Sequence, residues 1–343
     1  MAAGRFTSGP GARPAGEWGM DVGSEPIRGT ARPGRPVAWR RWLGWGLALL
    51  VVLAVAASVA ISWQVGLGLI HPEREPVTQD PGSRGLAFED VTFSSRDGIR
   101  LAGWFLPAAG GVAPRTVIFA HGYGKNRLQD DVPALDVAEA LVGTGFNVLM
   151  FDFRNSGESG GDRTTVGQEE VQDLVAAVEW VRRTHGPDQA VGLLGWSMGA
   201  VTAILAAGGG DGPAVQAVVA DAPFSDLRTY LEENLAHWTG LPEFPFNWLI
   251  RTLLPPLVDV HPERVRPVEA VARMAPTPLL LIHGTADTVI GPHHSRYLAL
   301  VAERSGVPVE LWEVEGAGHV KAYATAPEAY RQRVTAFFDA HLR

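Results

Sequence analysis

The chain has 343 residues, of which 46% are hydrophobic, and this is enough for one large domain with additional segments. Its formal net charge of −8 argues against a nucleic-acid partner. The sequence contains no cysteine, which excludes disulfides, thiolate metal sites and a cysteine nucleophile. Residues 1–41 carry seven Arg and three acidic residues, are rich in Gly, Pro and Ala, and show no apolar periodicity. This composition predicts a disordered basic tail.

A long apolar segment follows the tail. Residues 42–70 contain no Asp, Glu, Lys or Arg, and about 20 apolar residues suffice to cross a bilayer. Arg40 and Arg41 precede the segment and Glu73 follows it, so the positive-inside rule places the tail in the cytoplasm and the rest of the chain outside. We therefore expect a single-pass anchor in the cell membrane, followed by a polar, proline-containing linker over residues 71–87.

The same segment also fits a cleaved signal peptide. Residues 54–56 (Ala-Val-Ala) and 58–60 (Ser-Val-Ala) resemble cleavage sites, and cleavage would release a secreted protein. The long leader and the long apolar run favour the uncleaved anchor.

Residues 88–343 are expected to form the catalytic domain. Two strands, at residues 91–93 and 99–106, flank an Asp97-Gly98 turn. Strands then alternate with helices, which predicts a mostly parallel sheet of eight strands flanked by helices. The six further strands are expected at residues 116–120, 147–151, 190–194, 215–220, 277–283 and 309–314. The helices are expected at residues 135–142, 166–183, 200–207, 292–304 and 327–342.

Residues 224–275 break this alternation. The segment is rich in proline and carries several large apolar residues, which are Trp238, Phe244, Phe246, Trp248 and Leu249. We expect a small cap of short helices above the sheet.

The candidate nucleophile is Ser197, in the sequence Gly-Trp-Ser-Met-Gly at residues 195–199. An apolar strand precedes this G-x-S-x-G motif and an apolar helix follows it. At such a turn the serine hydroxyl is exposed above the sheet in strained backbone. The N-terminus of the following helix offers N–H groups to a developing anion.

Serine needs a base to remove its proton and an acid to orient that base. Asp287 follows one buried strand and His319 follows the next, in the chain order that the motif requires. Asp221 also ends a strand beside the site and is the alternative acid. His283 ends a buried strand and is expected to be a hydrogen-bonded core residue.

These motifs resemble those of the α/β-hydrolase superfamily over residues 88–343. The resemblance rests on G-W-S-M-G at 195–199, H-G-T-A-D at 283–287, G-A-G-H at 316–319 and F-A-H-G-Y-G at 119–124. Among subgroups, the chain resembles membrane-tethered, serine-aminopeptidase-like hydrolases. The resemblance implies that the backbone N–H groups of Tyr123 and Met198 form the oxyanion hole.

Two further expectations concern residues around these motifs. His121 is expected to hold the oxyanion loop rather than to act as a base. Residues 152–159 resemble the family's D-x-R-x-x-G-x-S loop, in which we expect Asp152 and Arg154 to pair or cap near the floor of the site.

The sequence therefore predicts a membrane-anchored serine esterase that acts on small-molecule or lipid esters and needs no metal or organic cofactor. His293 and His294 are adjacent in sequence, so they are expected to point about 100° apart on a helix rather than to bind a metal, and to be surface or N-terminal helix residues.

Two alternatives stay open. One is a peptidase or amidase, in which an acidic residue of the cap binds a substrate ammonium group; the candidates are Glu232, Glu233 and Glu243. The other is a tethered binding protein that has lost turnover.

Overall fold

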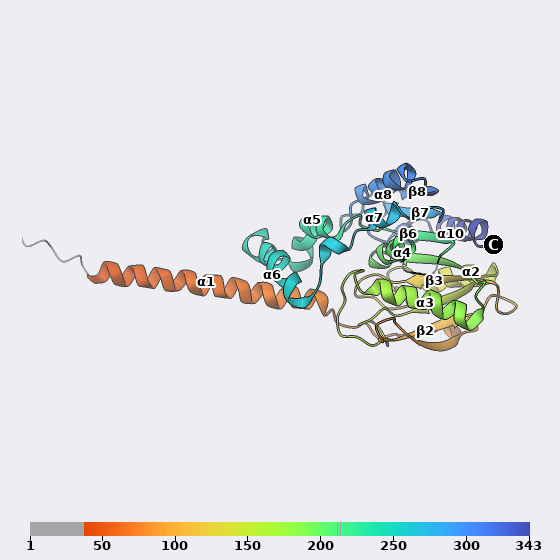
Figure 1. Ribbon diagram of the computed structural model, residues 1–343, viewed down its shortest axis with the longest axis horizontal. Coiled ribbons are helices and arrows are strands. Elements are labelled where there is room, and N and C mark those ends of the chain that lie inside the picture. Colours follow the sequence, from red (N-terminus) through yellow and green to blue (C-terminus); the bar gives the residue numbers. More distant parts are fainter. Residues whose placement is uncertain (1–37, 211, 213) are drawn as a thin grey trace, which may run out of the picture. The chain divides into compact units, whose positions relative to one another are not determined.

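The computed structural model describes residues 38–210, 212 and 214–343 (Figure 1). Most of the predicted tail, residues 1–41, lies outside the described residues. The chain divides into two compact units, Met1–Val52 and Leu53–Arg343. Helix α1 (Ala38–Ile70) begins in the first unit and ends in the second, which also contains the remainder of the chain.

Helix α1 is long and apolar enough over Trp39–Ile70 to cross a membrane, by length and composition; a signal sequence near the N-terminus would have the same properties. It ends at Ile70 because Pro72 follows closely, and the residue before a proline is disfavoured in helical backbone. The predicted apolar segment and the observed helix share this C-terminal end.

The eight predicted strands form one sheet in the order β1-β2-β4-β3-β5-β6-β7-β8. Strands β1 and β2 are antiparallel to their neighbours, and all pairs from β4 to β8 are parallel. The strands are β1 (Glu89–Ser94), β2 (Arg100–Leu106), β3 (Arg115–Ala120), β4 (Asn147–Phe151), β5 (Ala190–Trp196), β6 (Ala217–Asp221), β7 (Leu279–Gly284) and β8 (Val309–Val314). This arrangement confirms the predicted α/β-hydrolase fold.

Helices cover both faces of the sheet (Figure 1). Alternate strand residues enter two separate cores: Leu193 and Leu281 face one, and Leu194 and Leu280 face the other. The first core lies beneath α3 (Glu170–His185), α4 (Met198–Gly208) and α8 (His293–Arg304). The second lies beneath α2 (Ala134–Gly143) and α10 (Pro327–His341).

Helix α3 begins at Glu170, four residues later than the periodicity predicts. Val166 has a positive φ of 54°, which a helix does not accept. The Glu170 carboxylate instead accepts hydrogen bonds from the backbone N–H groups of Thr165 and Gly167, at 2.7 Å each. These bonds stabilise a turn where the apolar pattern alone indicates helix.

The predicted cap lies between β6 and β7. It contains α5 (Leu227–Thr239), the short helical turns η2 (Glu243–Asn247) and η3 (Pro262–Arg264), α6 (Trp248–Val258) and α7 (Pro267–Val271). Within this set, α7 belongs to the main fold, because Ala270 and Val271 are buried in the first core beside α4. The remaining elements form the part of the insertion that stands apart from the sheet.

Residues 71–87, predicted as a linker, follow the surface of the domain through specific hydrogen bonds. His71 Nδ1 lies 2.5 Å from the carbonyl oxygen of Asp162, and Arg74 donates to the carbonyl oxygen of Ser159 at 2.6 Å. Asn126 donates to the carbonyl oxygen of Pro76 at 3.1 Å. Local composition could not show these contacts, because each joins segments far apart in the sequence.

Candidate active site

Ser197 lies at the sharp turn between β5 and α4, with φ 54° and ψ −117°. For a residue other than glycine this conformation stores roughly 1–3 kcal/mol of strain. A Cβ atom on Gly199 would lie 1.9 Å from the carbonyl oxygen of Ala120, and one on Gly195 would lie 2.3 Å from that of Gly199. Both motif glycines are therefore required by the close approach of strand and helix.

The structure brings Ser197, His319 and Asp287 together. His319 Nε2 lies 3.0 Å from Ser197 Oγ, and His319 Nδ1 lies 2.7 Å from Asp287 Oδ2. Because the Asp287 carboxylate accepts at Nδ1, Nε2 of the neutral ring is left to accept the serine proton. The three residues follow β5, β7 and β8, whose carboxyl ends meet at one edge of the parallel sheet.

Asp287 is held as a carboxylate by its neighbours. Burial alone would raise its pKa, but hydrogen bonds from His283 and His319 hold the pKa well below the usual range. The backbone N–H groups of Val289 and Ile290 also donate to its Oδ1, at 2.9 Å each. The group facing His319 is thus charged and fixed in orientation.

His283 is buried and hydrogen-bonded, as the sequence predicts. Its Nε2 lies 2.8 Å from the carbonyl oxygen of Ile290 and 3.4 Å from Asp287 Oδ2, and its Nδ1 lies 2.7 Å from Ser295 Oγ. The ring therefore links α8 to the loop that carries Asp287.

Asp221, the alternative acid, makes a different contact. Its Oδ2 accepts a hydrogen bond from the Tyr330 hydroxyl at 3.0 Å, and Trp196 Nε1 donates to that same hydroxyl at 2.9 Å. Complete burial raises the pKa of Asp221 to about 7. The structure pairs His319 with Asp287 and gives Asp221 a place in the buried contact between β6 and α10.

The loop after β3, which carries Tyr123 as one of the two predicted oxyanion donors, is held on both sides by hydrogen bonds. Burial lowers the pKa of His121, so its ring is neutral. Its Nδ1 lies 2.8 Å from the carbonyl oxygen of Gly122, and its Nε2 accepts the backbone N–H of Phe153 at 2.9 Å. Gln129 Oε1 accepts the N–H of Gly122 at 2.5 Å, a contact that the sequence did not indicate. This geometry agrees with a supporting position for His121.

The predicted donors lie beside the serine. Met198 is the first residue of α4, where a helix leaves N–H groups without intrahelical acceptors. Tyr123 follows Gly122 in the loop after β3. The two donor residues, Tyr123 and Met198, line the same cavity as Ser197 and His319. Burial raises the pKa of Tyr123 to about 12, and its hydroxyl donates to the carbonyl oxygen of Leu69 at 2.6 Å.

The cavity at Ser197 has a volume of about 270 Å³. Its walls away from the serine are mainly apolar and come from the cap, the end of α1 and the loop before α3. These wall residues include Leu69, Val166, Leu227, Leu231, Leu235 and Trp238. Such a lining suits an apolar acyl group.

Asp152 and Arg154 both form ion pairs, but with other residues and not with each other. Asp152 instead accepts hydrogen bonds from the backbone N–H and the guanidinium of Arg127, at 2.7 and 2.6 Å. Arg154 binds Asp173 of α3 at 2.7 Å and Asp97 at 2.8 Å. The partners come from distant segments, so the local motif could not identify them. Both pairs fasten the loop after β4 to its surroundings.

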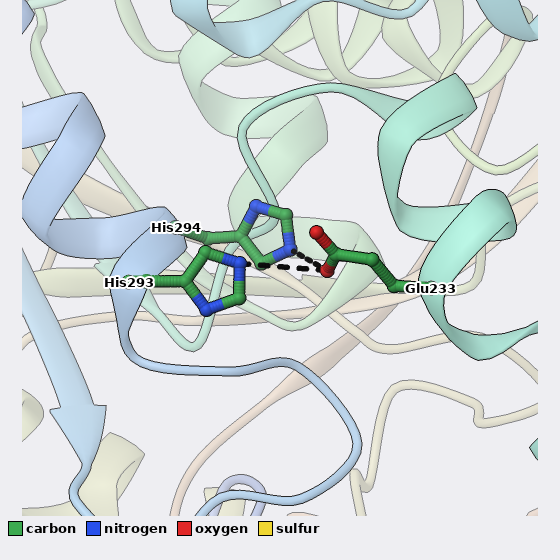
Figure 2. A group of neighbouring side chains, drawn as sticks. All are labelled: Glu233, His293 and His294. Atoms are coloured by element: carbon green, nitrogen blue, oxygen red, sulfur yellow. Dashed lines mark hydrogen bonds and ion pairs between the residues drawn. The ribbon is translucent and has the colours of Figure 1, made fainter.

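Figure 2 shows His293 and His294, at the start of α8, facing Glu233 of α5. The two ring Nε2 atoms lie 3.4 and 3.2 Å from the same Glu233 oxygen. The expectation that the rings diverge is therefore wrong, whereas the expected place of the pair at the N-terminus of a helix is confirmed; of the two residues, His294 is buried.

The hydrogen bonds of His294 do not suit metal coordination. The backbone N–H of Ser225 donates to its Nδ1 at 3.2 Å, so Nε2 carries the ring proton and points at Glu233. A metal at Nε2 would require the proton on Nδ1, where it would face that backbone donor. Burial lowers the pKa of His294 to about 4, so the contact is a hydrogen bond from a neutral ring.

The glutamates proposed as ammonium anchors lie away from the serine. Glu233 faces the two histidines, Glu232 binds Arg228, and Glu243 binds Arg251. None of the three lines the cavity at Ser197, whereas Asp131 does.

Comparison with known proteins places the chain in a family. Residues 135–343 match the model of the prolyl oligopeptidase family, and this span includes Ser197, Asp287 and His319. The chain belongs to the prolyl oligopeptidase family. The family is one of α/β hydrolases, so the superfamily resemblance in the sequence is confirmed, and the protein is a hydrolase.

Relatives of this prolyl oligopeptidase family member occur in several bacteria. YfhR of Escherichia coli is 29% identical over 295 residues, covering 84% of this chain and 93% of YfhR. Rv2307c of Mycobacterium tuberculosis is 30% identical over 285 residues, covering 80% of this chain and 88% of Rv2307c. Among solved structures, the esterase Pf2001 of Pyrococcus furiosus is 30% identical with a TM-score of 0.65, covering 79% of this chain and all of that chain.

Proposed function

We propose that the protein is a serine hydrolase that cleaves carboxylic esters through an acyl-enzyme intermediate. The observation that carries the proposal is the hydrogen-bonded series Ser197–His319–Asp287, of which Ser197 and His319 line a mainly apolar cavity. A base in contact with the nucleophile and an acid in contact with the base are the arrangement that activates serine.

The proposed reaction has two halves. Ser197 Oγ attacks the acyl carbon while His319 Nε2 takes the hydroxyl proton, and the N–H groups of Tyr123 and Met198 stabilise the oxyanion. The C–O bond to the leaving alcohol then breaks as His319 returns the proton to it. Water repeats the attack on the acyl-enzyme, which releases the acid and restores Ser197.

Three observations support ester cleavage over peptide cleavage. The walls of the cavity are mainly apolar, and the related Pf2001, which covers most of this chain, is an esterase. In addition, the three glutamates that an aminopeptidase reading would need do not line the cavity. An aminopeptidase is the second candidate. It is favoured by the family name and by Asp131, an acidic residue that does line the cavity at Ser197.

A fluorophosphonate probe and a substrate panel test this proposal. The full-length protein should be labelled at Ser197 and should hydrolyse p-nitrophenyl acyl esters faster than amino-acid anilides. Faster anilide cleavage that is lost in Asp131→Asn would establish the peptidase instead. If the folded protein is neither labelled nor active on either panel, it is a tethered binding protein without turnover.

We further propose that α1 anchors the protein in the cell membrane, with its basic N-terminus in the cytoplasm and the catalytic domain outside. The length and composition of the helix and the Arg40-Arg41 pair support this orientation. The protein should fractionate with membranes, and protease added to intact spheroplasts should digest the domain. A soluble product that begins near residue 57 or 61 would indicate a cleaved signal instead.

A further inference from the structure

The last turns of α1 pack against the cap within the second compact unit. Ser62, Gly66 and Ile70 are buried and share one face of the helix. Ser62 Oγ donates to the carbonyl oxygen of Phe246 at 3.1 Å. A Cβ atom on Gly66 would lie 2.7 Å from Leu254, so glycine permits the close approach of α6.

This packing is compatible with membrane insertion. About 20 residues of helix cross the hydrocarbon core, and the apolar segment of residues 42–70 is longer than that. Residues 42–61 suffice for the crossing, so residues 62–70 are available to contact the cap outside the bilayer.

A second cavity, of about 460 Å³, lies between the end of α1 and the cap helices. Its walls include Gly66, Ile250 and Leu254. Five apolar residues line both this cavity and the one at Ser197, and they are Leu69, Val166, Leu227, Leu231 and Leu235. The two cavities therefore adjoin, separated by these shared side chains.

We propose that the two cavities form one acyl-binding channel, that the end of α1 is one of its walls, and that the enzyme acts on esters of long, unbranched acyl chains. This inference rests on the proposed function and names its substrate class. The cavity at Ser197 is smaller than most ligand pockets, which measure roughly 300–1,000 Å³, whereas the second lies within that range.

The chemistry of the walls supports an acyl chain as the occupant. The reactive groups lie at the serine end, and the boundary between the two cavities is formed by aliphatic side chains alone. Charged residues of the second cavity are Arg228, Glu232, Arg251 and Glu263. Arg228 and Glu232 pair with each other at 3.1 Å, so this charge is largely balanced.

Leu69 is a useful position for testing the proposed channel, for two reasons. Its side chain lines both cavities, and its carbonyl oxygen accepts the Tyr123 hydroxyl. A larger side chain at position 69, or at position 231 on the facing helix α5, would narrow the boundary between the cavities. The carbonyl contact would be retained, because it belongs to the backbone.

The test measures kcat/KM of the full-length protein for p-nitrophenyl acetate, octanoate and dodecanoate, each below its micelle-forming concentration. Leu69→Trp and Leu231→Trp should lower kcat/KM for dodecanoate by about tenfold or more, since a few methylene contacts in an apolar pocket carry such discrimination. Both residues also line the cavity at Ser197, so the readout is the ratio of kcat/KM for dodecanoate to that for acetate, which should fall by about tenfold in each variant. Leu300→Trp, at an exposed position of α8, is the matched control and should behave as wild type.

Leu69→Ala and Leu231→Ala provide a second test, which does not require the folded protein to accommodate a large aromatic side chain. They should widen the boundary and raise the activity on a branched acyl ester relative to the straight chain. The inference is overturned if the Trp variants lower acetate and dodecanoate hydrolysis equally, or if all four variants leave the chain-length profile unchanged. Failure of the proposed function is distinct, because it would abolish fluorophosphonate labelling of the wild-type protein.

Discussion

The carboxyl edge of the sheet and the cap above it are built in different ways. At the sheet edge, Asp287 is buried and accepts several hydrogen bonds, and the loop around His121 is bonded on both sides. In the cap, Phe244 is 76% exposed and Leu257 is 66% exposed, although both are large and apolar. The first region holds chemical groups in position, whereas the second presents apolar surface to its surroundings.

The two regions are therefore expected to control different properties of the enzyme. Backbone topology brings the reactive groups together, because parallel strands end at one edge and their loops meet there. The cap is instead expected to select among substrates, since its helices and the end of α1 form walls of the two cavities. Changes at the sheet edge should therefore affect turnover of every ester, and changes in the cap should discriminate among esters.

The largest expected effect is that of Ser197→Ala. Removal of the nucleophile should lower kcat by about 10⁶ for short and long esters alike, and fluorophosphonate labelling should be lost. Circular dichroism should remain that of the wild type, because the change removes one oxygen atom. Residual activity of a few per cent would show that another residue attacks the ester.

Asp287→Asn should have the next largest effect. The amide keeps the size of the side chain but cannot stabilise the charged imidazole of His319, so kcat should fall by about 10⁴. Asp221→Asn is the matched control, since it makes the same chemical change one strand away and should leave kcat within about twofold. A greater loss in Asp221→Asn than in Asp287→Asn would contradict the assignment of the acid.

A smaller effect is expected from polar substitutions on the exposed surface of the cap. Phe244→Ser together with Leu257→Ser should lower turnover of esters presented in phospholipid vesicles by about three- to tenfold, because exposed apolar area favours contact with a lipid surface. Hydrolysis of soluble p-nitrophenyl acetate should be unchanged. Val112→Ser, at an exposed apolar position of the sheet domain, is the control. Equal turnover by the double variant and the wild type would exclude a membrane-facing role for this surface.

The smallest expected effect is on the pH dependence of the free energy of unfolding, to which Asp221 at the sheet edge contributes. Burial raises the pKa of Asp221 to about 7, well above the value near 3.9 in an unfolded chain. The folded state therefore holds this proton more tightly, and the stability it contributes is full below about pH 4 and is lost as the pH rises to about 7. Asp287 has the opposite dependence, because its lowered pKa contributes stability that is lost in acid.

Asp221→Asn should remove that loss, because the amide does not ionise and its oxygen can still accept the Tyr330 hydroxyl. Thermal unfolding between pH 4 and pH 8 should show a flatter pH dependence of Tm for the variant than for the wild type. Parallel curves for the two proteins would show that Asp221 titrates as an ordinary exposed carboxyl.

Much of this protein follows from local signals in its sequence. Apolar runs of strand length alternate with helical periodicity, and this pattern predicted the order and type of the sheet elements. The G-x-S-x-G turn and the polar residues after β7 and β8 identified Ser197, Asp287 and His319 as candidates. Each signal depends on the geometry of a few neighbouring residues or on where a buried strand ends, so a single sequence suffices to find it.

Other features depend on contacts between distant segments. Local patterns did not indicate the pair Arg127–Asp152, the turn that delays α3 until Glu170, or the burial of His294 against Ser225 and Glu233. The same holds for the end of α1, whose uniformly apolar sequence gives no sign that one face packs against the cap or that Leu69 lines the cavity at Ser197. Apolar periodicity shows that a face must be buried, but only the folded chain decides which partner covers it, because many apolar surfaces meet that requirement equally well.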